Sequence, residues 1–252
     1  MAGKKKLDVL LVERQLADTR EEAQSLIESG VVQVNGIVRR NKAGQYEQQA
    51  RITFVKERKY VSRGGYKLEG ALKAFSLNVR DEVCLDIGSS TGGFTDCLLQ
   101  GGAKRVYAVD VGYGILDWKL RQDKRVVLLE RTNARKLTYK KIGEWIDLCV
   151  IDASFISLNL LIEQVVQFFK EVVSIIALVK PQFQLPREKV TPGGVITDSL
   201  LHDEAIQMVS NYAETLGLRV ADTAASPLCG AKGNQEFFLL LRSAEGIERR
   251  NT

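Results

Sequence analysis

Histidines, paired cysteines and long apolar runs are the scarcest features of this sequence. The single histidine, His202, has no second histidine with which to form a metal site or a catalytic relay, and we expect it at a helix terminus. The cysteines form no C-x-x-C pair, and two of them lie in apolar, strand-like runs. We therefore predict reduced thiols in a cytosolic core and neither a disulfide framework nor a zinc site. The cysteines are Cys84, Cys97, Cys149 and Cys229.

Membrane-directed segments are also missing. No apolar run approaches the ~18 residues that a membrane-spanning helix needs. The N-terminus begins with basic residues, but Asp8, Glu13 and Arg14 interrupt the apolar stretch that a signal peptide would require next. The sequence thus predicts a soluble cytoplasmic protein with no membrane partner.

An excess of basic charge at one end is the first positive feature. The formal net charge is +5 over 252 residues. Residues 1–67 hold 14 Lys or Arg against 8 Asp or Glu, whereas the remainder holds 22 against 23. A basic segment attached to a near-neutral body suggests a polyanion-binding module beside a catalytic or ligand-binding domain. An ordinary solvated surface is the alternative, and charge alone does not decide between them.

The first 60 residues predict a small α+β unit. Leucines from Leu7 to Leu16 favour a short amphipathic helix, and Thr19 with Glu22 is typical of the start of a second helix, which Gly30 ends. Three short strands follow, at 31–34, 37–38 and 51–55, with a tight Asn-Gly turn between the first two. A polar connector precedes Tyr60, so we predict one domain over residues 1–59 and another over 60–252.

The second domain predicts a doubly wound α/β fold. After a helix ending near Phe75, strands and helices alternate five times, which implies a parallel sheet. The expected strands are 82–87, 105–110, 126–130, 147–152 and 172–180, and the expected helices are 94–101, 114–122, 134–142, 157–170 and 199–216. An antiparallel hairpin of 219–222 and 236–241 closes one edge. This plan is that of a Rossmann-like methyltransferase, with a mostly parallel seven-stranded sheet and helices on both faces.

A glycine-rich turn follows the first strand of this domain. The strand ends in Asp86, and a second apolar run about 20 residues later ends in Asp110, where an acid that binds ribose hydroxyls is expected. Glycine lets the backbone approach a ligand and turn with positive φ. We predict a nucleotide-like cofactor on Asp86, Gly88, Ser89, Ser90, Thr91, Gly92, Gly93, Phe94 and Asp110. The turn lacks the full G-x-G-x-x-G spacing, and a ligand-free turn is the alternative.

Two further polar residues end predicted strands. Asp152 ends the fourth strand, and Lys180 ends the fifth because Pro181 cannot continue the ladder. Ligands in open parallel sheets bind beyond these carboxyl ends, so we predict that Asp152 and Lys180 lie on adjacent strands beside the first strand. A salt bridge that only caps the sheet is the alternative.

Two helices followed by Val32-Gln33-Val34-Asn35-Gly36 resemble the S4 domain, a small RNA-binding module, over roughly residues 6–60. The resemblance implies an RNA partner, with neither DNA nor a membrane expected. Side chains on such a face contact mainly phosphates, which supply affinity and little sequence information. The implied RNA-binding residues are Arg14, Arg20, Arg39, Arg40 and Lys42, to which we add Arg63. For any one of them, a plain surface charge is the alternative.

Five ordered motifs bear a closer resemblance. They are Ser62–Leu68, Gly88–Thr95, Asp152–Leu158, Leu178–Phe183 and Gly233–Phe238. Together with the S4-like segment they resemble the TlyA (haemolysin A) family, S4-bearing relatives of the FtsJ-type ribose methyltransferases, over nearly the whole chain. The resemblance implies S-adenosylmethionine-dependent 2′-O-methylation of ribosomal RNA, on cytidine.

The resemblance also implies site residues. It places a catalytic tetrad on Lys67, Asp152, Lys180 and Glu236, and no metal. Asp152 would also contact the cofactor, and Asn133 would face its adenine, with a helix N-cap as the alternative for Asn133.

The tetrad suits methyl transfer to a ribose hydroxyl, which is a poor nucleophile and gains most from being positioned. Lys180 is predicted to be the general base or the group that steers the hydroxyl. A free lysine has a pKa near ~10.4, so a lysine base needs burial or a neighbouring cation, which Lys67 could supply, while Asp152 and Glu236 act in the opposite sense.

Three other functions are alternatives to this hypothesis. A non-catalytic RNA-binding or ribosome-assembly factor is disfavoured by the intact tetrad. A directly acting haemolysin is disfavoured by the missing membrane segments. A nicotinamide-dependent oxidoreductase is disfavoured by the turn spacing and by the basic N-terminal module.

Overall fold

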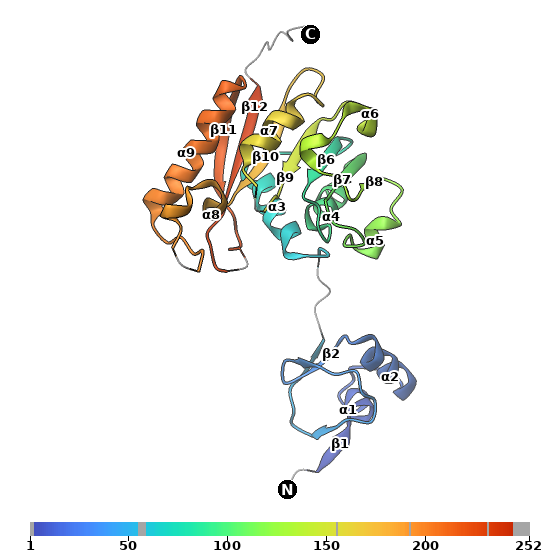
Figure 1. The fold of residues 1–252 in the computed structure, drawn as a ribbon. Helices are drawn as coiled ribbons and strands as arrows, with labels where there is room; N and C mark the ends of the chain where they lie inside the picture. The colour runs from blue at the N-terminus through green and yellow to red at the C-terminus, as the bar shows by residue number, and fades with distance from the viewer. Residues whose placement is uncertain (1–2, 55–58, 155, 192, 231, 244–252) are drawn as a thin grey trace. The chain divides into compact units, whose positions relative to one another are not determined.

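The computed structural model describes residues 3–54, 59–154, 156–191, 193–230 and 232–243. Its internal contacts divide the chain into two compact units, Met1–Lys59 and Tyr60–Thr252. Figure 1 shows both, and each is described by itself below.

The N-terminal unit is a small α+β fold. Its elements are β1 (Lys4–Lys6), α1 (Leu7–Glu13), α2 (Arg20–Ser29), β2 (Val32–Val34), β3 (Ile37–Val38), β4 (Gln45–Glu47) and β5 (Ile52–Phe54). The strands form an antiparallel sheet of order β3-β2-β5 and a separate β1-β4 pair. One face of α1 and α2 packs with the inner side of the three-stranded sheet through Leu7, Leu11, Ile27, Val32 and Val34.

Local chemistry explains how these elements begin and end. The Thr19 hydroxyl accepts a hydrogen bond from the Glu22 N–H (3.1 Å) and caps α2, as predicted. Gly30 ends α2 in the left-handed region (φ 78°), and Asn35 and Gly36 form the hairpin turn with φ of 52° and 79°. The prediction missed β1 and β4, because their residues are nearly all polar and carry no alternating apolar pattern.

The C-terminal unit is a seven-stranded sheet between helices. The strands are β6 (Val83–Ile87), β7 (Arg105–Val109), β8 (Val126–Leu129), β9 (Leu148–Ile151), β10 (Ser174–Val179), β11 (Leu218–Ala225) and β12 (Phe237–Ser243). Their order is β11-β12-β10-β9-β6-β7-β8. Strand β12 runs in the direction opposite to the other six. The predicted fold class, including the terminal hairpin, is confirmed.

Helices cover both faces of this sheet (Figure 1). They are α3 (Arg63–Ala74), α4 (Gly93–Gln100), α5 (Trp118–Arg121), α6 (Tyr139–Ile142), α7 (Leu158–Val166), α8 (Pro181–Gln184) and α9 (Ser199–Thr215), with the 3₁₀ helices η1 (Ala134–Lys136) and η2 (Arg187–Lys189). Alternate residues of β10 serve the two faces: Ile176 and Leu178 belong to the core under α3 and α4, whereas Ile175, Ala177 and Val179 belong to the core under α7 and α9.

Three predicted helices are shorter or broken, and each has a local cause. The helix predicted to begin at residue 114 begins at Trp118, because Gly114 has φ 73° and Asp117 supplies the cap. Residues 134–142 form η1 and α6, separated by the extended Thr138. Helix α7 ends at Val166, and Phe169 instead forms a β-bridge with Ile146.

The chain after β10 contains helix turns that the prediction missed. Pro181 occupies the first position of α8, where its fixed φ and missing N–H are tolerated. The strand does end before Pro181, as predicted, with Val179 as its last residue and Lys180 as the cap of α8.

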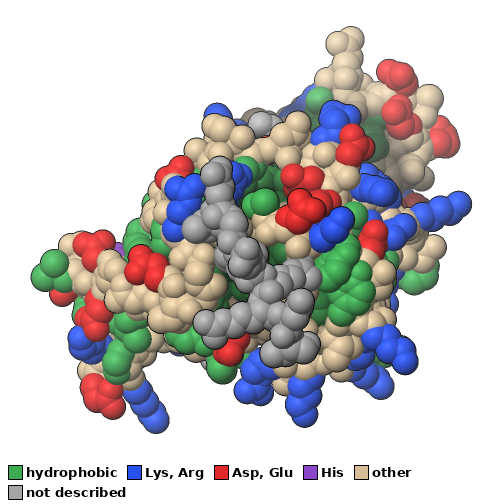
Figure 2. All heavy atoms as spheres, turned by 90° about the horizontal axis from the view of Figure 1, so that it is seen from above, with side chains coloured by type: hydrophobic (Ala, Val, Ile, Leu, Met, Phe, Trp, Pro, Cys, Tyr) green, Lys and Arg blue, Asp and Glu red, His purple; other side chains and the backbone are tan. Residues whose placement is uncertain are grey.

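The end of the sheet opposite the helical turns that follow β10 carries side chains of both charges. Figure 2 looks onto this end, where Lys or Arg and Asp or Glu side chains stand close to one another. A cavity of about 480 Å³ here is lined by Glu82, Trp145, Asp147 and Arg242, none of which belongs to the predicted site. Within the part of the chain that the structure describes, no helix combines the length and apolar character needed to cross a bilayer.

Candidate active site

Three cavities lie at the carboxyl ends of the parallel strands. The Asp110 cavity, of about 340 Å³, is lined by Gly88, Ser90, Asp110, Asn133, Asp152 and Ser154 among others. The Arg63 cavity, of about 220 Å³, is lined by Arg63, Lys67, Ser89, Thr91, Phe94 and Asp152 among others. The Lys180 cavity, of about 570 Å³, is lined by Lys67, Ser154, Lys180, Gln182, Phe183 and Glu236 among others. Shared lining residues, Asp152, Ser154 and Lys67, show that the three cavities adjoin one another.

The turn after β6 is held against the neighbouring strands. Gly88 has φ 83°, and a Cβ there would lie 2.5 Å from the backbone oxygen of Asp152. The N–H groups of Gly88 and Ser89 both donate to the Val109 carbonyl, at 2.9 and 3.1 Å. A side chain at position 88 is therefore excluded by backbone conformation and by space, which leaves the turn open to a ligand.

The carboxylate of Asp110 accepts hydrogen bonds from two loops. Its Oδ2 accepts a hydrogen bond from the Ser90 N–H (2.8 Å), and its Oδ1 accepts one from the Gly112 N–H (2.7 Å). Asn133 lines the same cavity and also caps η1, because its Oδ1 accepts from the Arg135 N–H (3.0 Å). The alternative of a helix N-cap is therefore seen for Asn133, and its contact with adenine stays a prediction.

Asp86 lies fully buried beneath the turn. Its Oδ2 accepts a hydrogen bond from the Thr95 hydroxyl (2.6 Å), and its Oδ1 has no hydrogen-bond partner among the described residues. Burial raises the pKa of this carboxyl to about 7; the Thr95 hydrogen bond opposes the shift, and the negative charge of Asp152 adds to it. Asp86 and Gly92 line none of the three cavities, whereas the other predicted cofactor-binding residues do.

The four predicted tetrad residues form two ion pairs. Lys67 Nζ lies 2.5 Å from Glu236 Oε2, and Lys180 Nζ lies 2.5 Å from Asp152 Oδ1. The second contact is close but is not aligned as a hydrogen bond, so Asp152 Oδ1 stays available to another donor. Lys67, Lys180 and Glu236 are buried, and Asp152 is half-buried.

Sheet topology brings these residues together. Asp152 directly follows β9, Lys180 directly follows β10 and Glu236 directly precedes the antiparallel β12, so all three leave the sheet at the same edge. Lys67 reaches this edge from α3, on the face covered by α4. The prediction that Asp152 and Lys180 lie on adjacent strands beside the first strand is confirmed.

Two polar residues near the tetrad were not predicted. The Ser154 hydroxyl accepts a hydrogen bond from Lys180 Nζ (3.0 Å). Asn234 is buried; its Oδ1 accepts from the Ile196 N–H (2.8 Å) and its Nδ2 donates to the Gly194 carbonyl (2.7 Å). Both lie inside motifs of the sequence, but only the folded chain shows which of the motif side chains face the lysine or the loop.

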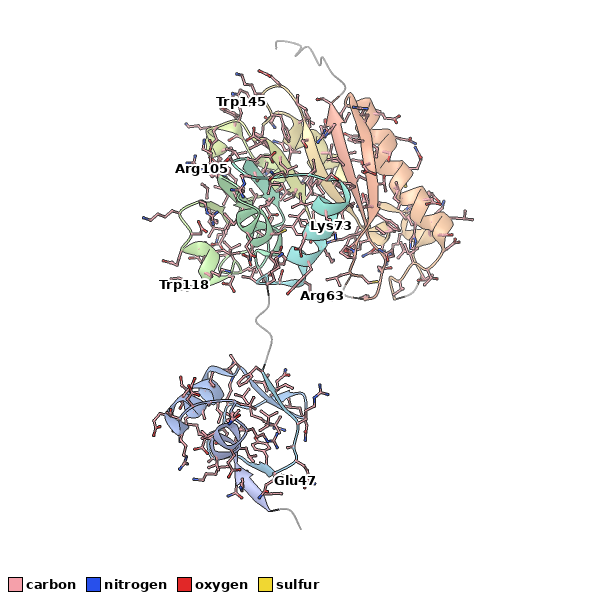
Figure 3. All side chains as sticks on the ribbon, turned by 180° about the vertical axis from the view of Figure 1, so that it is seen from behind. Glu47, Arg63, Lys73, Arg105, Trp118 and Trp145 are labelled. Atoms are coloured by element: carbon pink, nitrogen blue, oxygen red, sulfur yellow. The ribbon has the colours of Figure 1, made fainter. Side chains whose placement is uncertain are left out.

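Most predicted RNA-binding cations have intramolecular contacts. Arg14 donates to the Ala50 carbonyl (2.7 Å) and to the Gln48 carbonyl, and Arg20 pairs with the buried Asp8 (2.7 Å). Arg39 lies over the Tyr46 ring, Arg40 donates to the Glu28 carbonyl and Lys42 pairs with the Glu28 carboxylate. Arg63, labelled in Figure 3, donates to the Cys229 carbonyl (2.6 Å). Their contact with RNA stays a prediction.

Metal ligands are not grouped in the described chain. Across residues 3–54 and the described parts of 59–243, no cluster of three or more His, Cys, Asp or Glu side chains could hold a metal ion.

Comparison with known proteins identifies the class. The model of the FtsJ-like methyltransferase family matches residues 60–243, and that of the S4 domain matches residues 5–44. The C-terminal unit therefore defines a methyltransferase, and the N-terminal unit an S4 domain.

Full-length relatives identify the family more closely. The 16S/23S rRNA (cytidine-2′-O)-methyltransferase TlyA of Mycobacterium tuberculosis is 45% identical over 98% of this chain and 96% of its own length. A Brachyspira hyodysenteriae protein named Hemolysin A is 38% identical over 92% of this chain and 97% of its own. A solved Streptococcus thermophilus structure, described as a candidate haemolysin, has 39% identity and a TM-score of 0.73 and covers 96% of this chain and 90% of that one. The chain belongs to the TlyA family of S4-bearing FtsJ-like methyltransferases.

Gly88→Ala tests the turn. A Cβ at position 88 combines left-handed strain with a clash against Asp152, so binding of S-adenosylmethionine should weaken about tenfold or more. Isothermal titration calorimetry measures this. Gly143→Ala is the matched control, because Gly143 has a similar φ (78°) and open space around its Cβ. Equal affinities of the two variants would contradict a ligand on this turn.

Asp86→Asn tests the buried carboxyl. The folded pKa of Asp86, about 7, exceeds its unfolded value of 3.8, so its contribution to the free energy of unfolding is fully present below pH 4 and is lost as pH rises through 7. Between pH 5 and 8 the ligand-free wild type should lose on the order of a few kcal/mol relative to Asp86→Asn. Urea unfolding at several pH values measures both. Parallel pH profiles would show that Asp86 is not the titrating group.

Proposed function

We propose that this chain transfers a methyl group from S-adenosylmethionine to the 2′-hydroxyl of a cytidine in ribosomal RNA, in the cytoplasm, with the S4 unit binding the RNA. The observation that carries the proposal is the meeting of two buried lysine–carboxylate pairs where the Asp110 and Arg63 cavities adjoin the Lys180 cavity. The M. tuberculosis relative, named as a 16S/23S rRNA (cytidine-2′-O)-methyltransferase, supports the same substrate.

The first two cavities fit the methyl donor. Asp110 and Asn133 line the cavity that suits an adenosine, and the turn from Gly88 to Phe94 lines the one that suits a methionine moiety. Ser89 Oγ, a buried oxygen without a partner among the described residues, lines the Arg63 cavity and is suited to accept a hydrogen bond from an ammonium group. S-adenosylmethionine carries no phosphate, which agrees with a turn that departs from G-x-G-x-x-G. When bound, it supplies an electrophilic methyl group on a positively charged sulfur.

Lys180 is the residue that we assign to the acceptor hydroxyl. Two of the groups around its Nζ are Asp152 and Ser154, which fix the side chain from one side. Among the described residues its Nζ has no third partner, so it can bind a 2′-hydroxyl in the Lys180 cavity and hold it in line with the methyl group. As the new oxygen–carbon bond forms and the sulfur–carbon bond of the donor breaks, Lys180 in its amine form would accept the hydroxyl proton.

Lys67 and Glu236 form the second ion pair at the Lys180 cavity. Lys67 lines both the Arg63 cavity and the Lys180 cavity, so its charge faces donor and acceptor alike. A lone ammonium in a buried place is costly, and Glu236 at 2.5 Å offsets that cost. Both members of this pair line the Lys180 cavity, so the pair helps to shape the place where the acceptor would bind.

The S4 unit supplies the sequence-independent part of RNA binding in this proposal. Arg39, Arg40 and Lys42 follow the hairpin on the same unit as Arg14 and Arg20, and Arg63 lies at the mouth of the donor cavity. Each of these six side chains already has a contact within the protein, so its position is restricted before RNA binds. This restriction lowers the conformational entropy that the side chain loses when it binds a phosphate.

The substrate test uses labelled donor and ribosomal subunits. Incubation with S-adenosylmethionine carrying a labelled methyl group, and with small or large subunits from a strain that lacks the modification, should label RNA at a 2′-O-methylcytidine that nuclease digestion and mass spectrometry can locate. A labelled base in place of ribose, or no label in either subunit or its naked RNA, rules out the proposed activity.

Lys180 variants separate positioning from proton transfer. Lys180→Ala should lower the rate constant of methyl transfer by about 10²–10⁴-fold with S-adenosylmethionine binding unchanged. Lys180→Arg keeps the charge and the donors but cannot accept a proton, so it should be nearly as slow. Lys140→Ala, on the exposed side of α6, is the control and should have wild-type activity. A fully active arginine variant would leave Lys180 a positioning residue only.

A further inference from the structure

The Lys180 cavity is larger than the transfer of one methyl group to a ribose hydroxyl requires. Its volume of about 570 Å³ exceeds that of either donor-side cavity and falls within the ~300–1,000 Å³ typical of sites for whole small molecules. Besides three members of the tetrad, its lining includes Gln182, Phe183, Val190, Lys232 and Asn234. A nucleotide whose ribose meets Lys180 therefore has space for its base in the same cavity.

One side chain that lines this cavity, Gln182, has a buried acceptor oxygen, Oε1, without a hydrogen-bond partner among the described residues. A buried acceptor in this state is destabilising and uncommon in folded proteins. Ser89 Oγ, which is in the same state, lines a donor-side cavity. Gln182 is the corresponding residue on the acceptor side.

A second glutamine on the same helix shows the contrast. Gln184 Oε1 accepts a hydrogen bond from the Leu158 N–H (3.2 Å) and so ties α8 to α7. Gln182, two residues earlier and two residues after Lys180, has no such structural bond among the described residues and instead lines the cavity. Lys180 and Gln182 are held close together by the short α8 turn, which Pro181 starts.

We propose that Gln182 recognises the base of the nucleotide that is methylated, through a hydrogen bond from the exocyclic amino group of cytosine to Oε1. This inference rests on the proposed function. The carbonyl oxygen is the buried end of the amide, so it can accept a hydrogen bond from the amino group of cytosine. Uracil carries a carbonyl oxygen in place of that amino group, and two acceptor oxygens that face each other form no hydrogen bond. Phe183 and Val190 provide an aromatic and an apolar surface against which an unstacked base can lie.

The test compares two bases at one position. The subunit or RNA fragment in which the labelling experiment locates the methyl group is prepared with cytidine or with uridine at that position, and kcat/KM for methylation is measured on each. The wild type should prefer cytidine by about tenfold or more, as expected where a buried polar group loses its partner. In Gln182→Leu the ratio should fall toward one, and in Gln182→Glu, which keeps an acceptor oxygen, the preference for cytidine should remain.

The controls make each outcome decisive. Gln167→Leu repeats the substitution at an exposed position at the end of α7 and should keep the wild-type ratio. Binding of S-adenosylmethionine should be unchanged in every variant, which shows that each is folded. If Gln182→Leu methylates neither base, Gln182→Glu decides, and a ratio near one in that variant overturns the inference. A wild-type ratio in Gln182→Leu also overturns it while leaving the methyltransferase activity standing, whereas an inactive wild type removes the proposed function itself.

Discussion

Three neighbouring strands, β9, β10 and β12, leave the sheet at one edge, and the Lys180–Asp152 pair depends on that arrangement. Asp152 and Lys180 face each other because their parallel strands are adjacent, and Glu236 joins them because β12 is inserted antiparallel beside β10. A carboxylate and an ammonium this deeply placed stabilise each other only at close range, since each loses hydration on burial. The pair is therefore as much a consequence of strand order as of residue type.

Periodicity and strand-end chemistry were sufficient to predict the sheet, its terminal hairpin and the adjacency of Asp152 with Lys180. They failed for β1, whose residues are all lysine, and for residues 134–142, where the extended Leu137 and Thr138 split the predicted helix. Contacts between distant segments could not be predicted from the residues alone: the Lys67–Glu236 pair joins positions 169 residues apart, and its assignment came from resemblance to a family. Gln182 lay inside a recognised motif, but its missing partner exists only in the folded chain.

Unpaired buried oxygens are concentrated where ligands would bind. Asp86 Oδ1, Ser89 Oγ and Gln182 Oε1 have no hydrogen-bond partner among the described residues and lie at or beneath the three adjoining cavities, within or just after strands β6 and β10. One more such oxygen, Asn159 Oδ1, is on α7 and lines none of these cavities. A protein interior normally satisfies such atoms. The proposed binding of donor and acceptor would explain why three of them are grouped at one end of the sheet.

Asn234 connects two parts of the site. By binding the backbone of both Gly194 and Ile196, it ties the wall of the Lys180 cavity to the segment that enters β12. Glu236 is only two residues further on, and Lys67 is bound to it. A single buried amide therefore joins the loop at the Lys180 cavity to the carboxylate that holds Lys67, so the shape of that wall and the position of that ammonium are fixed by the same side chain.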